Sequence, residues 1–131
     1  HEFLGSDVEG KDMLIIDDMN SSGESVREVA AARKKRKARK IFVCATFGLF
    51  TNGLDSFDQA YKEGIIDRVL TTNLIYQPAE LLEREWYVNC SMSKYVAYLI
   101  DTLNHDTSIS DLLNPNEKIQ KLLMKYRSGK L

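Results

Sequence analysis

The chain has 131 residues, a length that suits one compact domain with a core of its own. Hydrophobic residues make up 44% of it and charged residues 28%, which excludes a disordered chain, a collagen-like repeat and a disulfide-rich miniprotein. Eighteen basic against nineteen acidic residues give a net charge of −1, so we expect no nucleic-acid partner and no membrane partner. The apolar stretches are far shorter than the roughly 20 residues of a membrane-spanning helix.

Two cysteines, Cys44 and Cys90, each stand in an apolar, strand-like segment. We expect both to be buried, reduced thiols, which indicates a cytoplasmic location. The first three residues, His1, Glu2 and Phe3, are either a cloning remnant or native sequence that follows a cut.

Short apolar runs alternate with amphipathic segments along most of the chain. The runs predict buried strands, and apolar residues at helical spacing predict the helices between them. The predicted strands cover residues 12–17, 41–46, 68–72 and 86–90, and the predicted helices cover residues 22–37, 55–63, 78–84, 93–104 and 117–126. Residues 47–53 are predicted as a loop, and Gly64 is predicted to end the second helix.

This alternation predicts an α/β fold with a doubly wound, mainly parallel sheet flanked by helices. We assign residues 1–114 to that domain and residues 115–131 to a helical tail. Ligands of such sheets bind at the carboxyl ends of the strands. The loops after Asp17, Thr46 and Thr72 are therefore the candidate sites.

The loop after the first strand carries the densest set of polar residues. It consists of Asp17 and Asp18, then Met19 and Asn20, then Ser21, Ser22, Gly23, Glu24 and Ser25. Free N–H groups at a helix start bind phosphate, Gly23 permits close approach, and the serine hydroxyls donate hydrogen bonds. The two aspartates would accept hydrogen bonds from sugar hydroxyls or hold hydrated Mg²⁺. The pattern therefore predicts a sugar-phosphate site.

Two other interpretations of the same loop stay open. An ordinary serine-capped helix after an acidic strand end has the same composition. A pair of adjacent acids is also typical of phosphoacceptor receiver domains, although the run of serines and glycine has no role there.

Residues 15–25, Ile-Ile-Asp-Asp-Met-Asn-Ser-Ser-Gly-Glu-Ser, resemble the motif for 5-phosphoribosyl 1-diphosphate (PRPP) of the type I phosphoribosyltransferase fold. Residues 45–50, 71–73 and 106–110 resemble, in order, segments of the ribose-phosphate pyrophosphokinases, or PRPP synthetases. The resemblance runs from about residue 3 to residue 113. It favours the synthetases over PRPP-using phosphoribosyltransferases, whose base-recognition segment has no counterpart here.

The resemblance implies an enzyme that transfers the diphosphate of ATP to the 1-hydroxyl of ribose 5-phosphate with Mg²⁺, by positioning and charge neutralisation. It assigns no catalytic residue to this chain. Asp17 and Asp18 would face the ribose hydroxyls and the metal, and Ser108 and Ser110 would contribute to an allosteric phosphate or ADP site. The 5-phosphate would be held by Ser21, Ser22, Gly23, Glu24 and Ser25.

Three positions depart from the family pattern. Many members have aspartate where Ser21 stands, a small residue where Glu24 stands, and histidine where Phe47 stands. These departures leave open a non-catalytic, regulatory subunit of the same family.

The family has a first domain, a strand and a mobile basic loop before the matched region, and these supply most contacts to ATP. We therefore expect a C-terminal piece that is inactive by itself. A sheet truncated in this way leaves an edge and an apolar face open, which predicts a homo-oligomer.

Residues 33–40 contain seven basic side chains. The plainer interpretation is a solvated helix end that complements the helix dipole. A nuclear-localisation signal or a polyanion-binding patch is the alternative.

Overall fold

The structure is a computed structural model that describes residues 8–20, 24–110 and 114–129. The chain forms two compact units, His1–Ser91 and Met92–Leu131. The first unit contains the sheet and its connecting helices, and the described part of the second contains the helices α4 (Ser93–Asn104) and α6 (Asn116–Arg127).

The first unit is a four-stranded parallel sheet with the strand order β1-β2-β3-β4. The strands are β1 (Met13–Asn20), β2 (Ile41–Gly48), β3 (Arg68–Thr72) and β4 (Tyr87–Cys90). They are connected in turn by α1 (Glu24–Lys35), α2 (Asp55–Lys62) and α3 (Ala79–Leu82). The predicted parallel α/β sheet with flanking helices is confirmed.

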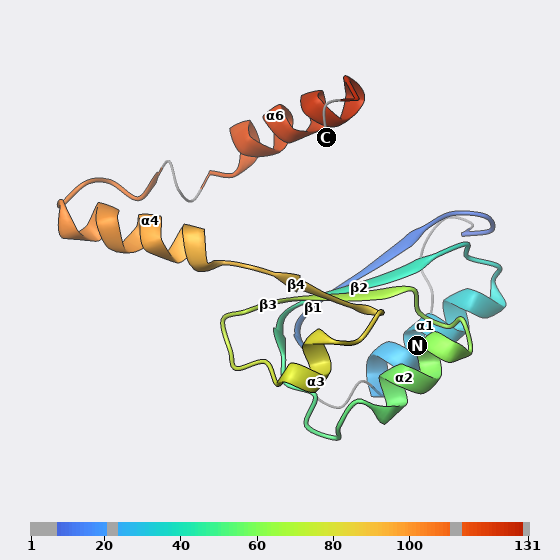
Figure 1. Ribbon diagram of the computed structural model, residues 1–131. Coiled ribbons are helices and arrows are strands. Elements are labelled where there is room, and N and C mark those ends of the chain that lie inside the picture. Colours follow the sequence, from blue (N-terminus) through green and yellow to red (C-terminus); the bar gives the residue numbers. More distant parts are fainter. Residues whose placement is uncertain (1–7, 21–23, 111–113, 130–131) are drawn as a thin grey trace. The chain divides into compact units, whose positions relative to one another are not determined.

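The three connecting helices lie on one face of the sheet (Figure 1). Right-handed crossovers between strands in sequential order place every helix on the same side. The helices that connect the four described strands therefore form one of the two helix layers of a doubly wound sheet.

The core lies between this face and the helices. Ile41, Val43 and Val69 point toward the helices and are fully buried, as is Ala30 of α1. Their alternation along β2 and β3 follows from the two-residue repeat of a strand. The central strands thus supply the aliphatic part of the core.

An aromatic cluster ties α2 to the segment before β4. The rings of Phe57 and Trp86 stack with centroids 5.4 Å apart, and Phe50 packs edge-on against Phe57 at 5.1 Å. Trp86 is buried, and its Nε1 donates a 2.7 Å hydrogen bond to Asp58 Oδ1. Arg84 Nε donates to the same carboxylate at 3.0 Å, so the one buried indole N–H is satisfied and its acceptor is charge-balanced.

On the opposite face of the sheet, the open face, the described residues of the first unit leave several apolar side chains exposed. Leu14 and Ile16 of β1 are 56% and 77% exposed, and Val88 of β4 is 37% exposed. Cys44 and Cys90 are free thiols on this face, but each is only partly buried. The prediction of two buried thiols was wrong because it assumed that both faces of the sheet would be covered.

The first two strands extend further than their composition predicts. β1 pairs with β2 as far as Asn20 opposite Gly48, so the predicted ends at residues 17 and 46 were wrong. A Cβ on Gly48 would lie 2.6 Å from Phe50 Cε2 and 2.8 Å from Thr71 Cγ2, so only glycine fits there. Backbone pairing with a neighbouring strand therefore outweighs the turn-forming composition of these residues.

Gly64 follows α2 with a φ of +67°, and its N–H donates to the carbonyl of Tyr61 at 3.0 Å. This left-handed position favours glycine, and it confirms Gly64 as the residue that ends the helix.

In the second unit the structure describes α4 (Ser93–Asn104) and α6 (Asn116–Arg127), close to the predicted bounds. Neither helix has a buried residue among those described. Among the described residues, no helix is long and apolar enough to cross a membrane.

Candidate functional site

Asp17 and Asp18 lie in the carboxyl half of the edge strand β1. Asp17 is half-buried and pairs with Ala45 of β2, and its Oδ1 accepts a 2.9 Å hydrogen bond from the Asp18 N–H. Asp18 is exposed. Because adjacent strand residues point to opposite faces, the two carboxylates leave β1 on opposite sides. A ligand that contacts both must lie beyond the end of the strand.

The start of α1 lies next to this strand end in the chain. β1 ends at Asn20 and α1 begins at Glu24, so three residues connect them. Ser21, Ser22 and Gly23 lie outside the described residues. A twelve-residue helix presents free N–H groups and the positive end of its dipole at its start, which suits an anion.

Glu24 and Ser25 are the first two residues of α1. An acidic residue in a first turn stabilises the helix through the same dipole that would attract a phosphate.

A cavity of about 230 Å³ lies at the carboxyl ends of the strands. It is formed by all four strands, and its lining consists of residues 16–17, 44–46 and 70–72 together with Cys90. The lining is mostly apolar, with the threonines and Asp17 as its polar members. Sequence reasoning missed this cavity, because it depends on the register that brings Cys90 of β4 level with Thr72 of β3.

Hydrogen bonds hold the carboxyl end of β3 in place. Thr72 Oγ1 donates to the Thr46 carbonyl at 2.6 Å, and Gln77 Nε2 donates to the Thr72 carbonyl at 2.9 Å. The buried Thr71 hydroxyl lies 2.7 Å from the Tyr87 hydroxyl, which also accepts a hydrogen bond from Gln77. The loop after β3 is thereby tied to β2 and β4. Gln77 and Tyr87 were not predicted as site residues, because neither stands in a recognisable motif.

The donor set at the end of β1 suits magnesium better than a softer metal. No group of three or more His, Cys, Asp and Glu residues that could hold a metal ion occurs in the described part of the chain. Mg²⁺ needs no such cage, since it is commonly bound by one or two carboxylates, water and the phosphates of a substrate. The oxygens of Asp17 and Asp18 are ligands of that kind.

Ser108 and Ser110 belong to the second unit. Their hydroxyls are exposed and lie 2.6 Å apart, and the Ser110 N–H donates to Ser108 Oγ at 3.2 Å. The structure thus brings these two predicted residues together at one point of the surface.

The basic run lies at the opposite end of the sheet from Asp17 and Asp18. Arg33, Lys34 and Lys35 form the last turn of α1, as predicted. The other basic residues of the run follow the helix and lead into β2, so they do not belong to a helix end. The helix-dipole interpretation therefore accounts for only part of the run.

Comparison with known proteins decides the family. A model of the phosphoribosyl synthetase-associated domain matches residues 3–114. The chain belongs to this family. The predicted relation to the ribose-phosphate pyrophosphokinases is confirmed by curated relatives of that name.

The ribose-phosphate pyrophosphokinase of Vibrio parahaemolyticus is 32% identical over 112 residues, which cover 85% of this chain and 34% of the relative. That of Mycoplasma genitalium is 38% identical over 72 residues, which cover 54% of this chain and 22% of the relative. The chain thus spans about a third of the length of the most extensively matched relatives.

The crystal structure of phosphoribosylpyrophosphate synthetase from Mycobacterium smegmatis has a similar fold. It superposes with a TM-score of 0.67 at 20% sequence identity, covering 78% of this chain and 33% of the other. The shared fold is the parallel sheet with its flanking helices.

Proposed function

We propose that this chain is the sugar-phosphate-binding part of a ribose-phosphate pyrophosphokinase, which transfers the diphosphate of ATP to the 1-hydroxyl of ribose 5-phosphate and releases AMP. One observation carries the proposal: Asp17 and Asp18 lie in the carboxyl half of β1 in a parallel sheet, and only three residues separate the end of β1 from the start of α1. Membership of the family supports it.

Each group in this arrangement has a separate role. The 5-phosphate binds at the start of α1, where the N–H groups and the hydroxyls of Ser21, Ser22 and Ser25 donate to its oxygens, and Gly23 permits close approach. Asp17 and Asp18 accept hydrogen bonds from the ribose hydroxyls and ligate Mg²⁺ beyond the carboxyl end of β1. The metal, when bound, neutralises phosphate charge. Ser108 and Ser110 form part of a separate regulatory phosphate site in the assembled, homo-oligomeric enzyme.

A titration with ribose 5-phosphate tests the proposal. We expect the amide resonances of Gly23 and Ser25 to shift saturably, with weak affinity alone and higher affinity with Mg²⁺, because Asp17, Asp18 and Glu24 set a negative background. Asp18→Asn should remove most of the effect of Mg²⁺, whereas the exposed Asp101→Asn on α4 should leave it unchanged. The site assignment is wrong if saturating ligand with Mg²⁺ moves other amides and leaves these two in place.

A second candidate function is favoured by the position of Glu24. A carboxylate in the first turn of α1 repels a phosphate at the start of that helix. A non-catalytic regulatory subunit, which need not bind the substrate, would tolerate this repulsion. In that case ribose 5-phosphate binds only after Glu24→Ala. In the enzyme, the unaltered chain binds ribose 5-phosphate with Mg²⁺ and Glu24→Ala changes the affinity by less than about tenfold.

The chain by itself should make no PRPP in either case, because the resemblance assigns the cations that contact ATP to segments upstream of it. Release of AMP from ATP and ribose 5-phosphate by the purified 131-residue chain, with host enzyme excluded, would contradict this expectation.

A further inference from the structure

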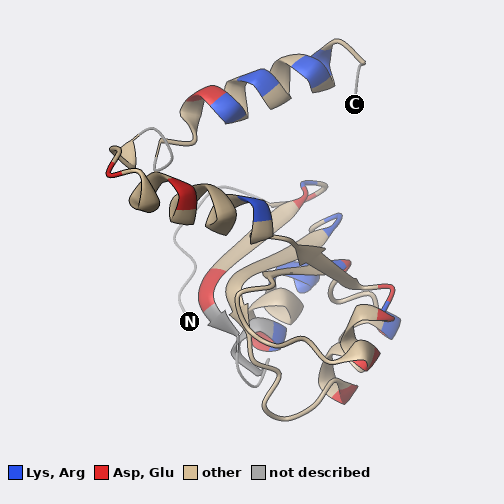
Figure 2. Ribbon diagram, turned by 60° about the vertical axis from the view of Figure 1, so that its left-hand side comes forward, with Lys and Arg blue, Asp and Glu red and all other residues tan. Residues whose placement is uncertain are grey.

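Basic side chains gather where β1 and β2 begin. We call this set the basic amino-end surface, and it consists of Lys11, Arg33, Lys34, Lys35, Arg36, Lys37, Arg39 and Lys40. These are eight of the eighteen basic residues of the chain, and all except Arg33 and Lys34 are exposed. Figure 2 shows the blue segments at the turns that precede the strands.

Two turns that are distant in sequence form this surface side by side. The Arg39 N–H donates to the Lys11 carbonyl at 2.9 Å, and the Gly10 N–H donates to the Lys37 carbonyl at 2.9 Å. Ala38 is buried between the flanking basic residues. The cations are therefore carried on a backbone that is hydrogen-bonded to its neighbour and anchored in the core.

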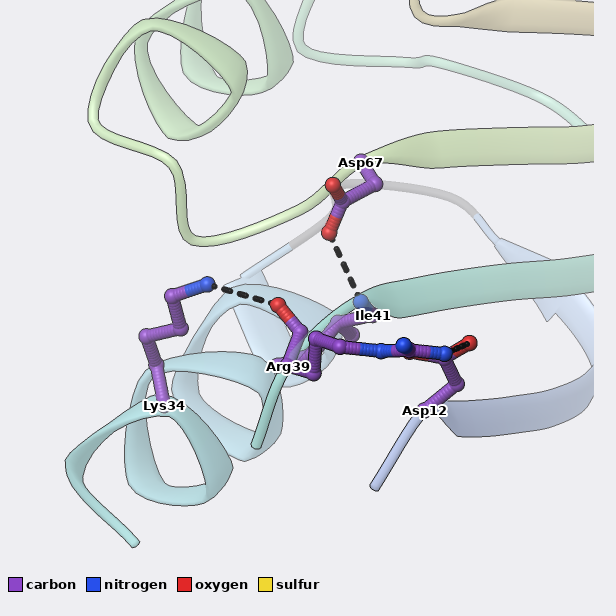
Figure 3. Close-up of polar contacts among 5 residues, drawn as sticks. All are labelled: Asp12, Lys34, Arg39, Ile41 and Asp67. Atoms are coloured by element: carbon purple, nitrogen blue, oxygen red, sulfur yellow. Dashed lines mark hydrogen bonds and ion pairs between the residues drawn. The ribbon is translucent and has the colours of Figure 1, made fainter. Parts of the chain in front are cut away.

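Acidic residues neutralise only part of the surface. The Arg39 guanidinium donates from Nε and Nη2 to the two oxygens of Asp12 at 2.8 and 2.7 Å (Figure 3) and holds the pKa of that carboxyl below its usual value. Lys37 Nζ lies 2.9 Å from Glu9 Oε1, and Asp67 accepts the Ile41 N–H at 2.8 Å.

Apart from Arg33 and Arg36, which have other interaction partners, six cations stand against these three carboxylates and leave an excess of three positive charges among the described residues. The net charge of the whole chain is −1, so the other charged residues together carry −4. The overall charge therefore conceals a strong local asymmetry.

A linear targeting signal fits this segment poorly. Peptide-recognition domains take up an extended strand, a polyproline helix or a continuous α-helix. Here α1 ends at Lys35, Lys37 has a φ of +61°, and the Lys40 carbonyl accepts a 2.7 Å hydrogen bond from the Met13 N–H at the start of β1. The segment would have to unfold to be bound as a peptide.

We propose that the basic amino-end surface binds the phosphate backbone of nucleic acid without reading its sequence. A fixed cluster of lysines and arginines neutralises several phosphates at once and releases their counterions. None of the described residues that make up this surface is aromatic, so it offers no ring on which a base could stack, which favours contacts to the backbone.

This surface is separate from the candidate sugar-phosphate site. Asp18 of β1 lies six residues along the chain from Asp12, which directly precedes the strand, a distance of about 20 Å in an extended segment. Nucleic acid bound at the amino ends leaves the carboxyl ends accessible, so the proposal does not depend on the proposed function.

Fluorescence anisotropy with a labelled duplex DNA of about 20 base pairs tests the proposal on the 131-residue chain. We expect binding at about 50 mM salt that weakens roughly 10- to 100-fold at about 200 mM. Duplexes of unrelated sequence should bind within about twofold of each other. Absence of binding at about 50 mM salt with about 100 µM protein would overturn the proposal.

Two triple variants with the same change in charge locate the binding surface. Lys11→Gln, Lys35→Gln and Lys40→Gln together remove three exposed cations and leave the Arg39–Asp12 and Lys37–Glu9 pairs intact. Lys118→Gln, Lys121→Gln and Lys125→Gln on α6 are the matched control. We expect at least a tenfold loss of affinity for the first and less than about twofold for the control, with circular dichroism confirming that both are folded.

Two outcomes contradict the location or the partner. An equal loss in both triple variants would show that only the total charge matters. Competition by a polyglutamate peptide as effective as that of a duplex of the same charge would indicate an acidic protein as the partner instead.

Discussion

The two faces of the sheet differ in burial far more than in composition. Ile41 and Val43 of β2 are fully buried under the helices, whereas Leu14 and Ile16 of β1 are more than half exposed on the opposite face. Both sets are aliphatic residues that alternate along parallel strands. The difference arises because all three connections cross on the same side. Apolar strand residues therefore indicate a face that favours burial, and the connections decide which face the chain buries by itself.

The largest expected difference between the two faces is in the free energy of unfolding lost when one isoleucine on each face is truncated to alanine. Ile41→Ala leaves a cavity in the core and should lower the free energy of unfolding by about 2–5 kcal/mol. Ile16→Ala removes the same atoms from the open face and should cost less than about 0.5 kcal/mol. Urea denaturation followed by circular dichroism measures both. Similar costs for the two variants would mean that the open face is covered within this chain.

Self-association is the next largest effect expected from the open face. Exposed aliphatic side chains beside β1, which is an edge strand among the described residues, should drive the chain into dimers or larger species at micromolar concentrations. Ile16→Lys should shift it toward the monomer in light scattering. Tyr76→Lys, at a position that is 87% exposed in the loop after β3, is the control and should have little effect. A monomeric unaltered chain would argue against a homo-oligomer formed through this face.

The smallest expected effect of the open face is on the reactivity of its thiols. Burial, with a smaller contribution from the nearby Cys90, raises the pKa of Cys44 above its usual value. Iodoacetamide should therefore alkylate Cys44 in the folded chain at pH 8.5 several-fold more slowly than it alkylates glutathione, and unfolding should abolish the difference. Mass spectrometry of the alkylated peptides measures the rates. Cys90→Ser is the control that removes the contribution of Cys90 to the Cys44 pKa.

The same pKa shift has a defined effect on stability. A raised pKa in the folded state means that the folded chain holds this proton more tightly than the unfolded chain. The contribution of Cys44 is therefore complete below the unfolded pKa near 9.0 and is lost as the pH rises above it. A Cys44 thiol that reacts as fast as glutathione would contradict both expectations.

Local sequence determined the elements and the location of the candidate site. The apolar runs and helical spacings predicted all four strands, and the acids Asp17 and Asp18 were expected at the carboxyl end of the first strand. These features depend on hydrophobic periodicity and on chain order, which a sequence displays directly. The polar residues after that strand, together with residues 45–50, 71–73 and 106–110, suggested the family, which the comparisons then confirmed.

Tertiary structure alone decided where the strands end, which face stays open and how the charges group. The pairing of Asn20 with Gly48 lengthens two strands beyond their apolar residues. The basic run gains Lys11 because two turns separated in sequence are hydrogen-bonded at the start of a parallel pair. Strand register, crossover side and contacts between distant turns depend on partners far along the chain, and periodicity within one segment does not specify them.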